Sequence, residues 1–233
     1  MIQKQQLLTL LRDDTAVEAL GNYTAAQLHE LFGTAFAAMK GYAQNNPHHC
    51  YDLLTHTLKV VCAVKPQGIA QTDFEVLRTA ALFHDIGKPS VAALAVDRTV
   101  YPQHAAQSAL ITAPLLERIG FGPLEKERIL FFVENHDMFI GFYFPEEMQR
   151  FEGRREINER KVNAAVKRVI NRAYQERIYY PGDADFLLLL RLCQADCSAQ
   201  SESVVYKDWA RDSKEKKLLR LEAIRQILLK KVV

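Results

Sequence analysis

Residues 72–89 read TDFEVLRTAALFHDIGKP, an amphipathic pattern that runs directly into a histidine and an aspartate. The positions i, i+3, i+4 and i+7 of this pattern are taken by Leu77, Ala80, Ala81 and His84. Residues at this spacing share one face of a helix, and because the face is otherwise apolar we expect His84 to point into the core. A single buried histidine is ordinary in a core. His84 therefore indicates a functional site only if other polar side chains also lie on apolar helix faces.

Three more polar side chains lie beside or in phase with apolar residues elsewhere. His56 flanks the stripe of Leu53, Val60 and Val64; His136 follows Ile129, Phe132 and Val133; Asp196 follows Leu189, Leu192 and Cys193. Burying a carboxylate without a partner is costly, and Arg191 points away from Asp196 by helical phase. A divalent metal shared by several helices would supply the partner. The ligand set contains no thiolate, which suits a hydrolytic ion better than a structural zinc; it consists of His56, His84, Asp85 and Asp196.

Composition narrows the class of protein. The chain has 233 residues and 26.6 kDa, with 48% hydrophobic and 25% charged residues, which is ordinary for a globular protein. A formal net charge of +2 argues against a simple polyanion binder. The first residues do not resemble a signal peptide, and the densest apolar run, Phe186 to Leu190, is too short to span a membrane. We therefore expect a cytoplasmic protein whose four cysteines, which form no CxxC pair, are reduced.

The pattern of secondary structure is helical throughout. No stretch alternates between apolar and polar residues at period two, so we predict an all-α fold. Thr24 opens one helix, and Thr72 with Glu75 three residues later predicts a capping box for another. The predicted helices cover residues 2–12, 24–40, 50–64, 72–87, 102–119, 123–137, 156–178, 184–200 and 212–231.

The same residues resemble the H…HD…D signature of the HD-domain metal-dependent phosphohydrolases, and especially the HD module of bacterial CCA-adding enzymes (tRNA nucleotidyltransferases). The segments that carry this resemblance are His49–Leu58, His84–Pro89, Val133–Asp137, Val166–Asn171 and Leu192–Gln200. It implies an HD-domain helical bundle over residues 45–233, preceded by accessory helices in residues 1–44. Those 44 residues are too short for a nucleotidyltransferase head, so the resemblance implies a free-standing hydrolase, or a relic that keeps the fold for another purpose.

The resemblance also implies roles for individual residues. The metal ligands would be His56, His84, Asp85 and Asp196; the catalytic residues Asp85, Lys88, His104 and His136; the substrate-binding residues His49, Lys88 and Arg168. Lys88 follows the predicted helix end, so we expect it to reach a substrate phosphate but not the metal ligands. Two alternatives stay open for His104 and His136: they hold a second metal ion, or they bind phosphate and donate a proton to the leaving group.

The predicted activity is hydrolysis of a phosphoester by a metal-activated water. Its substrate would be a nucleotide, a cyclic phosphate or an RNA end, and its cofactor a divalent ion: Mn, Fe, Ni, Co, Mg or Zn. The alternative is a non-catalytic module that binds RNA through the basic segments 150–180 and 207–231, or that senses a nucleotide.

Two surfaces have open interpretations. The aromatic loop 139–144 either stacks on a nucleobase or closes the bundle as an apolar plug. The amphipathic segment 207–231 either packs back on the domain or forms a homodimer.

Overall fold

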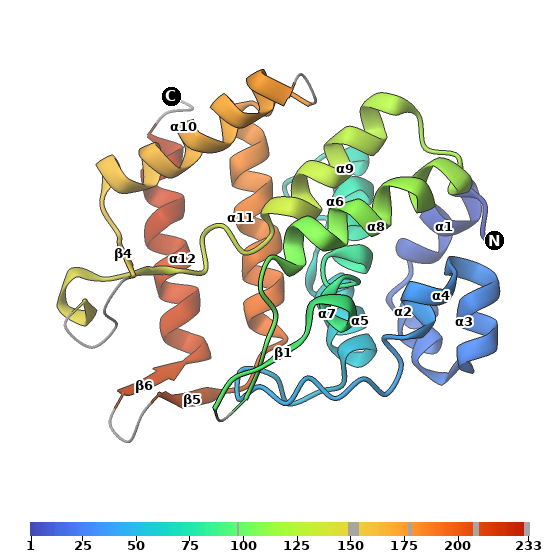
Figure 1. Ribbon diagram of the computed structural model, residues 1–233. Helices are drawn as coiled ribbons and strands as arrows, with labels where there is room; N and C mark the ends of the chain where they lie inside the picture. Colours follow the sequence, from blue (N-terminus) through green and yellow to red (C-terminus); the bar gives the residue numbers. More distant parts are fainter. Residues whose placement is uncertain (97, 149–153, 177–178, 207–209, 231–233) are drawn as a thin grey trace.

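The computed structural model describes the chain except for residues 97, 149–153, 177–178, 207–209 and 231–233 (Figure 1). The fold is of the all-α class, with little sheet, as the sequence predicts. The helices are α1 (Lys4–Leu11), α2 (Asp14–Ala19), the 3-10 turn η1 (Leu20–Asn22), α3 (Ala25–Phe32), α4 (Thr34–Ala37), α5 (Leu53–Ala63), α6 (Gln71–Phe83), α7 (Lys88–Val91), α8 (His104–Ile119), α9 (Pro123–Asn135), the 3-10 turn η2 (Pro145–Glu147), α10 (Glu159–Glu176), α11 (Asp183–Ser198) and α12 (Lys214–Leu229).

Short paired strands accompany the helices, contrary to the prediction of helix alone. They are β1 (Ala93–Leu94) with β2 (Thr99–Val100), antiparallel; β3 (Phe142–Tyr143) with β4 (Arg155–Glu156), parallel; and β5 (Ser203–Tyr206) with β6 (Ala210–Ser213), antiparallel. The two-residue strands are too short to show an alternating pattern, which needs four or more residues, and the four-residue sequences SVVY and ARDS of β5 and β6 do not alternate between apolar and polar residues. Because β6 extends to Ser213, the last predicted helix begins at Lys214, two residues later than expected, and Ser213 caps it.

Local capping explains where the other predictions were correct and where they were wrong. Thr24 caps α3 through the backbone N–H of Gln27, as predicted. The predicted helix 24–40 is broken at Gly33, whose φ of +89° lies in the left-handed region. The predicted capping box at Thr72 is wrong, because α6 begins one residue earlier after Ala70, which makes no side-chain cap. The ends of the predicted helices 156–178 and 212–231 lie outside the described residues.

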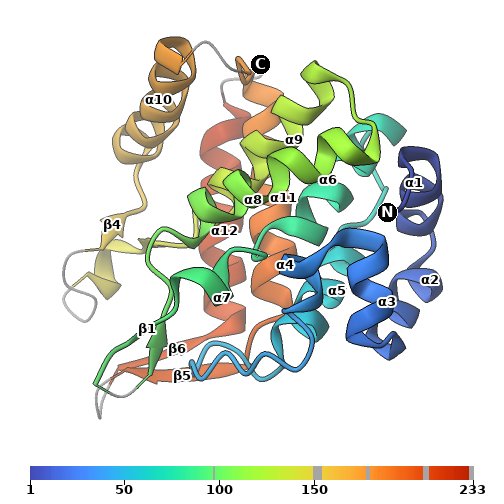
Figure 2. The same cartoon turned by 45° about the vertical axis from the view of Figure 1, so that its right-hand side comes forward.

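One hydrophobic core runs through the described part of the chain. Helix α11 lies between α12 on one side and α5 and α6 on the other, and α9 packs on α6 and α8 (Figures 1 and 2). The N-terminal helices α1 and α2 pack on α6 and α5. The division of the chain at residue 44 stays a prediction.

Both segments with open interpretations are packed into this core. Helix α12 lies along α11 and buries Leu221, Ile224 and Leu228, so this segment packs on the domain; a homodimer stays a prediction. In the aromatic loop Phe139 and Phe142 are buried, as expected of an apolar plug. None of the described helices is both long and apolar enough to cross a membrane.

Candidate metal centre

The first histidine of the predicted site sits in the first turn of α5. Asp52 caps this helix by accepting a hydrogen bond from the Thr55 backbone N–H at 2.7 Å, which fixes the start of the helix. His56 is fully buried. Its Nδ1 lies 3.3 Å from the Ala199 carbonyl oxygen, so its Nε2 is directed the other way, toward Asp85 and Asp196.

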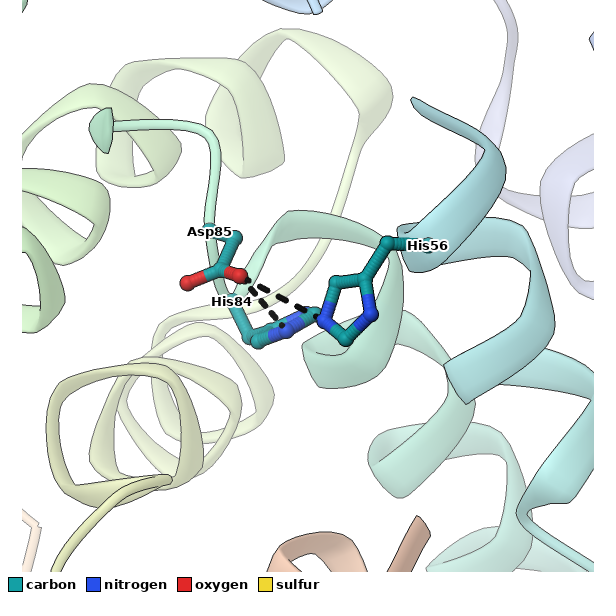
Figure 3. A group of neighbouring side chains, drawn as sticks. All are labelled: His56, His84 and Asp85. Carbon is teal, nitrogen blue, oxygen red and sulfur yellow. Dashed lines mark ion pairs between the residues drawn. The ribbon is translucent and has the colours of Figure 1, made fainter. Parts of the chain in front are cut away.

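His84 and Asp85 lie where α6 ends (Figure 3). His84 is the C-cap residue, and its Nδ1 lies 2.8 Å from the Ala81 carbonyl oxygen of the last helical turn. Its Nε2 lies 3.2 Å from Asp85 Oδ2, and His56 Nε2 approaches the same oxygen at 3.6 Å. Two imidazoles from different helices therefore face one carboxylate oxygen, as the dashed lines in Figure 3 show.

The second oxygen of Asp85 faces two further histidines. His104 is the first residue of α8, and His136 is the C-cap residue of α9. Their Nε2 atoms lie 3.4 Å and 3.5 Å from Asp85 Oδ1, and 3.2 Å from each other. Their Nδ1 atoms lie 3.0 Å and 2.8 Å from the carbonyl oxygens of Tyr101 and Val133.

The four histidines share one arrangement around Asp85. In each, Nδ1 faces a backbone carbonyl oxygen to which it can donate, and Nε2 faces the carboxylate, where it could ligate a metal ion. Several of the buried atoms that have no hydrogen-bond partner among the described residues belong to this cluster: Nε2 of His56, Nε2 of His84 and Oδ1 of Asp85. Orphaned donor atoms of this kind, all nitrogen and oxygen, fit a divalent metal ion.

Asp196 of α11 completes the first side of this cluster. Its Oδ1 lies 3.1 Å from His56 Nε2 and 3.5 Å from Gln200 Nε2. Arg191 does point elsewhere, as expected, and donates to the carbonyl oxygens of Lys65 and Gln67. The buried carboxylate thus has polar neighbours from other elements even though no basic residue of its own helix reaches it.

Mutual electrostatics keep the carboxylates ionised. Burial alone would raise the pKa of Asp85, but His84 and Lys88 outweigh it and hold that pKa well below its usual value. Burial is likewise outweighed at Asp196, whose pKa is lowered by its contact with His56. Asp85 overcomes the effect of burial on His136 and raises its pKa to about 9. Burial lowers the pKa of His104, so in the metal-free protein His136 carries the proton that lies between the two rings.

Lys88 is part of the cluster, which corrects the expectation that it lies beyond the metal ligands. Its backbone N–H donates to the Asp85 carbonyl oxygen in a tight turn, which folds the side chain back over the carboxylate. Its Nζ lies 2.7 Å from Asp85 Oδ2, 3.0 Å from Gln44 Oε1 and 3.3 Å from His49 Nε2. Burial and the Lys88 charge lower the pKa of His49 to about 2, so that ring is neutral.

Gly87 allows the two halves of the cluster to meet. A Cβ atom at this position would lie 2.6 Å from the Ser108 backbone nitrogen and 2.9 Å from the His104 carbonyl oxygen. The Gly87 N–H also donates to Ser108 Oγ at 2.9 Å. Helix α8 therefore packs directly against the backbone after the motif, which brings His104 within reach of Asp85.

The cluster opens into a cavity of about 460 Å³. Of the predicted substrate-binding residues, Lys88 and His49 line it, whereas Arg168 is exposed on α10 beside a separate hollow of about 260 Å³. Tyr143 of the aromatic loop 139–144 and Arg154 of the basic segment 150–180 also line the cavity. The sequence analysis did not single out four further lining residues: His48, Tyr101, Gln200 and Lys217. One signal was available for Lys217, which precedes the buried Leu221 and Ile224 by four and seven residues and so shares their face.

Comparison with known proteins agrees with this architecture. Residues 53–168 match the family model of the HD domain. The match supports an HD-domain protein, a class whose members have a helical fold, bind divalent metals and are generally metal-dependent hydrolases. No curated protein matches the chain. The match carries no support for a relationship to the CCA-adding enzymes.

Proposed function

We propose that the protein is a phosphohydrolase that uses two divalent metal ions, and that Asp85 would help to hold both of them. The first ion would be held by His56, His84, Asp85 and Asp196, and the second by Asp85, His104 and His136. The observation that carries this proposal is the convergence of four histidine Nε2 atoms on one carboxylate, two on each oxygen. Groups of three potential ligand atoms within 4.8 Å of one another occur on both sides of Asp85.

Metal ions held in this way would polarise a phosphoryl group and lower the pKa of water toward neutrality. The pKa values of Asp85 and Asp196 are lowered and the four Nε2 atoms face inward, and metal binding requires ionised carboxylates and inward-facing ligand atoms. His136 carries a proton that a metal ion would have to displace, because its pKa is raised to about 9. Metal binding should therefore tighten as the pH rises.

The chain supplies positive charge for a phosphate next to this cluster. The Lys88 ammonium lies beside Asp85 and over the ring of Tyr101, 5.3 Å from its centroid. An ammonium at this position can stabilise the negative charge that develops on a phosphoryl group during hydrolysis. This favours Lys88 as the residue that acts on the reacting phosphate.

The cavity supports a small phosphoester as the substrate. Its volume of about 460 Å³ falls within the range of small-molecule sites. Tyr101 and Tyr143 line it together with Arg154, which gives aromatic and cationic walls of the kind that bind nucleotides. We propose a nucleotide, a cyclic phosphate or an RNA-end phosphoester, cleaved as a phosphomonoester or a phosphodiester.

A metal analysis combined with a hydrolysis screen tests this function. The purified protein is assayed with mononucleotides, 2′,3′-cyclic nucleotides and short 3′-phosphorylated RNA in the presence of Mn, Fe, Ni, Co, Mg or Zn. We expect His84→Ala and Asp85→Ala to lose bound metal and hydrolysis together while keeping their helical circular dichroism. His29→Ala serves as the control, since His29 is exposed in α3. Full activity in either site variant would contradict the proposal.

A further inference from the structure

Lys217 is a buried lysine in the wall of the cavity, and the proposed mechanism does not use it. It lies in the first turn of α12, is 5% exposed, and lines the same cavity as Asp85 and Asp196. Burial lowers its pKa. No carboxylate of the described residues forms an ion pair with it. Burying an ammonium that forms no ion pair is costly, so the position needs an explanation.

The hydrogen bonds of Lys217 differ from those of Lys88 in one respect. Lys88 Nζ contacts three acceptors, which matches the three donors of an ammonium. Lys217 Nζ contacts only two, His48 Nδ1 at 3.1 Å and Gln200 Oε1 at 2.8 Å. One donor of Lys217 therefore has no acceptor among the residues that the structure describes.

Charges of both signs lie near Lys217: burial lowers its pKa even though the charges of Asp212 and Asp196 raise it. The neighbouring His48 lines the cavity, and its pKa is lowered to about 3 by burial together with the charges of Lys217, Arg98 and Arg154. Arg154 lines the cavity as well, next to Tyr143. Lys217 and Arg154 thus supply two cationic side chains to the wall of one cavity, which favours the binding of an anion there.

Each of the two buried lysines contacts one of two consecutive histidines. His49 contacts Lys88, and His48 contacts Lys217. Lys88 reaches Asp85 directly, whereas Lys217 reaches Asp196 only through Gln200. Lys217 therefore lies one residue further from the metal ligands than Lys88 does.

We infer that Lys217, His48, Gln200 and Arg154 form a second anion subsite, which binds a non-reacting phosphate group of the substrate. The inference rests on the proposed phosphohydrolase function and narrows its substrate to a phosphoester that carries a second phosphate. Lys217 is then a specificity-determining residue: it favours substrates with two phosphate groups over those with one.

A ladder of phosphonates tests this subsite, because their C–P bonds resist hydrolysis. Binding to the metal-loaded protein is measured by calorimetry for propylphosphonate and for bisphosphonates with spacers of two, three and four carbons. We expect at least one bisphosphonate to bind wild type about tenfold more tightly than the monophosphonate, as a charge-assisted contact allows. We expect this preference to fall within threefold in Lys217→Met, which keeps the aliphatic stem, and to persist in Lys216→Met, whose lysine is exposed on the same helix.

Each other outcome overturns the inference. If wild type shows no preference for any bisphosphonate, the subsite does not exist, and this result needs no variant. If the preference survives in Lys217→Met, the lysine is not part of it. If Lys217→Met loses metal and both kinds of ligand together, Lys217 only supports Gln200 against Asp196. Equal binding of 3-phosphonopropionate would contradict a second phosphate. Metal content and hydrolysis of mononucleotides, measured in parallel on wild type, test the phosphohydrolase function separately.

Discussion

Replacing Asp196 by asparagine should remove most of the stability that the protein gains from metal. The side chain is 8% exposed and lies 3.1 Å from His56 Nε2, so asparagine keeps the shape and one acceptor but loses the charge that a metal ion requires. At a metal concentration of about 100 times the dissociation constant, binding stabilises the folded state by about 2.7 kcal/mol. If the affinity falls about a hundredfold, about 0.4 kcal/mol of that gain remains.

The assay is thermal unfolding with metal and with chelator. A loss of about 2.3 kcal/mol corresponds to a fall of about 5–9 °C in the metal-dependent shift of Tm for a chain of this size. Asp185→Asn is the matched control, because Asp185 is a buried aspartate of the same helix that pairs with Arg128 and Tyr179 instead. We expect the control to melt earlier in both conditions while keeping the full chelator shift. If chelator lowers the Tm of Asp196→Asn as much as that of wild type, Asp196 is not a ligand.

Four further variants probe other parts of the account. His136→Gln should bind one metal ion per chain where wild type binds two, as counted by elemental analysis; two retained ions would remove His136 from the ligand set. Lys88→Met should keep its metal and lose turnover about 10–100-fold, since a charge-assisted contact contributes about 1.5–3 kcal/mol; unchanged kcat would contradict the role of Lys88. Gly87→Ala should unfold at lower denaturant, by about 1–3 kcal/mol, because its Cβ would lie 2.6 Å from the Ser108 nitrogen; wild-type stability would show that α8 can move away at little cost. His48 has a folded pKa of about 3, so the unfolded chain takes up a proton below about pH 6.5 that the folded chain does not, and stability falls as the pH drops. His48→Gln should show a shallower loss between pH 6.5 and 5 in urea titrations, and an unchanged slope would contradict that burial.

Much of the fold could be predicted because its helices are long and their apolar faces regular. The three polar residues in phase with apolar stripes, His84, His136 and Asp196, are indeed buried and lie in one cluster. Their positions on the apolar helix faces predict that they point into the core. Because burying a polar side chain without a partner is costly, this favours a site that the three side chains share. Which helices face one another is a tertiary property, and the resemblance to the HD domain supplied it.

What could not be predicted depends on short elements and on close packing. Lys88 folds back onto Asp85 because a tight turn precedes α7, a helix of four residues that has no readable period. His104 reaches Asp85 because Gly87 has no side chain, so α8 can pack directly against its backbone. This contact joins two separate segments and cannot be predicted from the local sequence of either. The spacing of Lys217 to Leu221 predicts that it is buried on the apolar face of α12. The cavity that Lys217 lines is formed by several other segments, so its role there could not be predicted from the helix alone.

The most direct test of the central claim is the anomalous scattering of manganese in crystals of the protein. The account predicts two peaks that share Asp85 as a bridging ligand, one beside His56, His84 and Asp196 and the other beside His104 and His136. A single peak on the His56 side would leave a one-metal site and remove the second ion. Manganese bound elsewhere, or absent from the cluster at saturating concentration, would contradict the claim that these side chains form a metal centre.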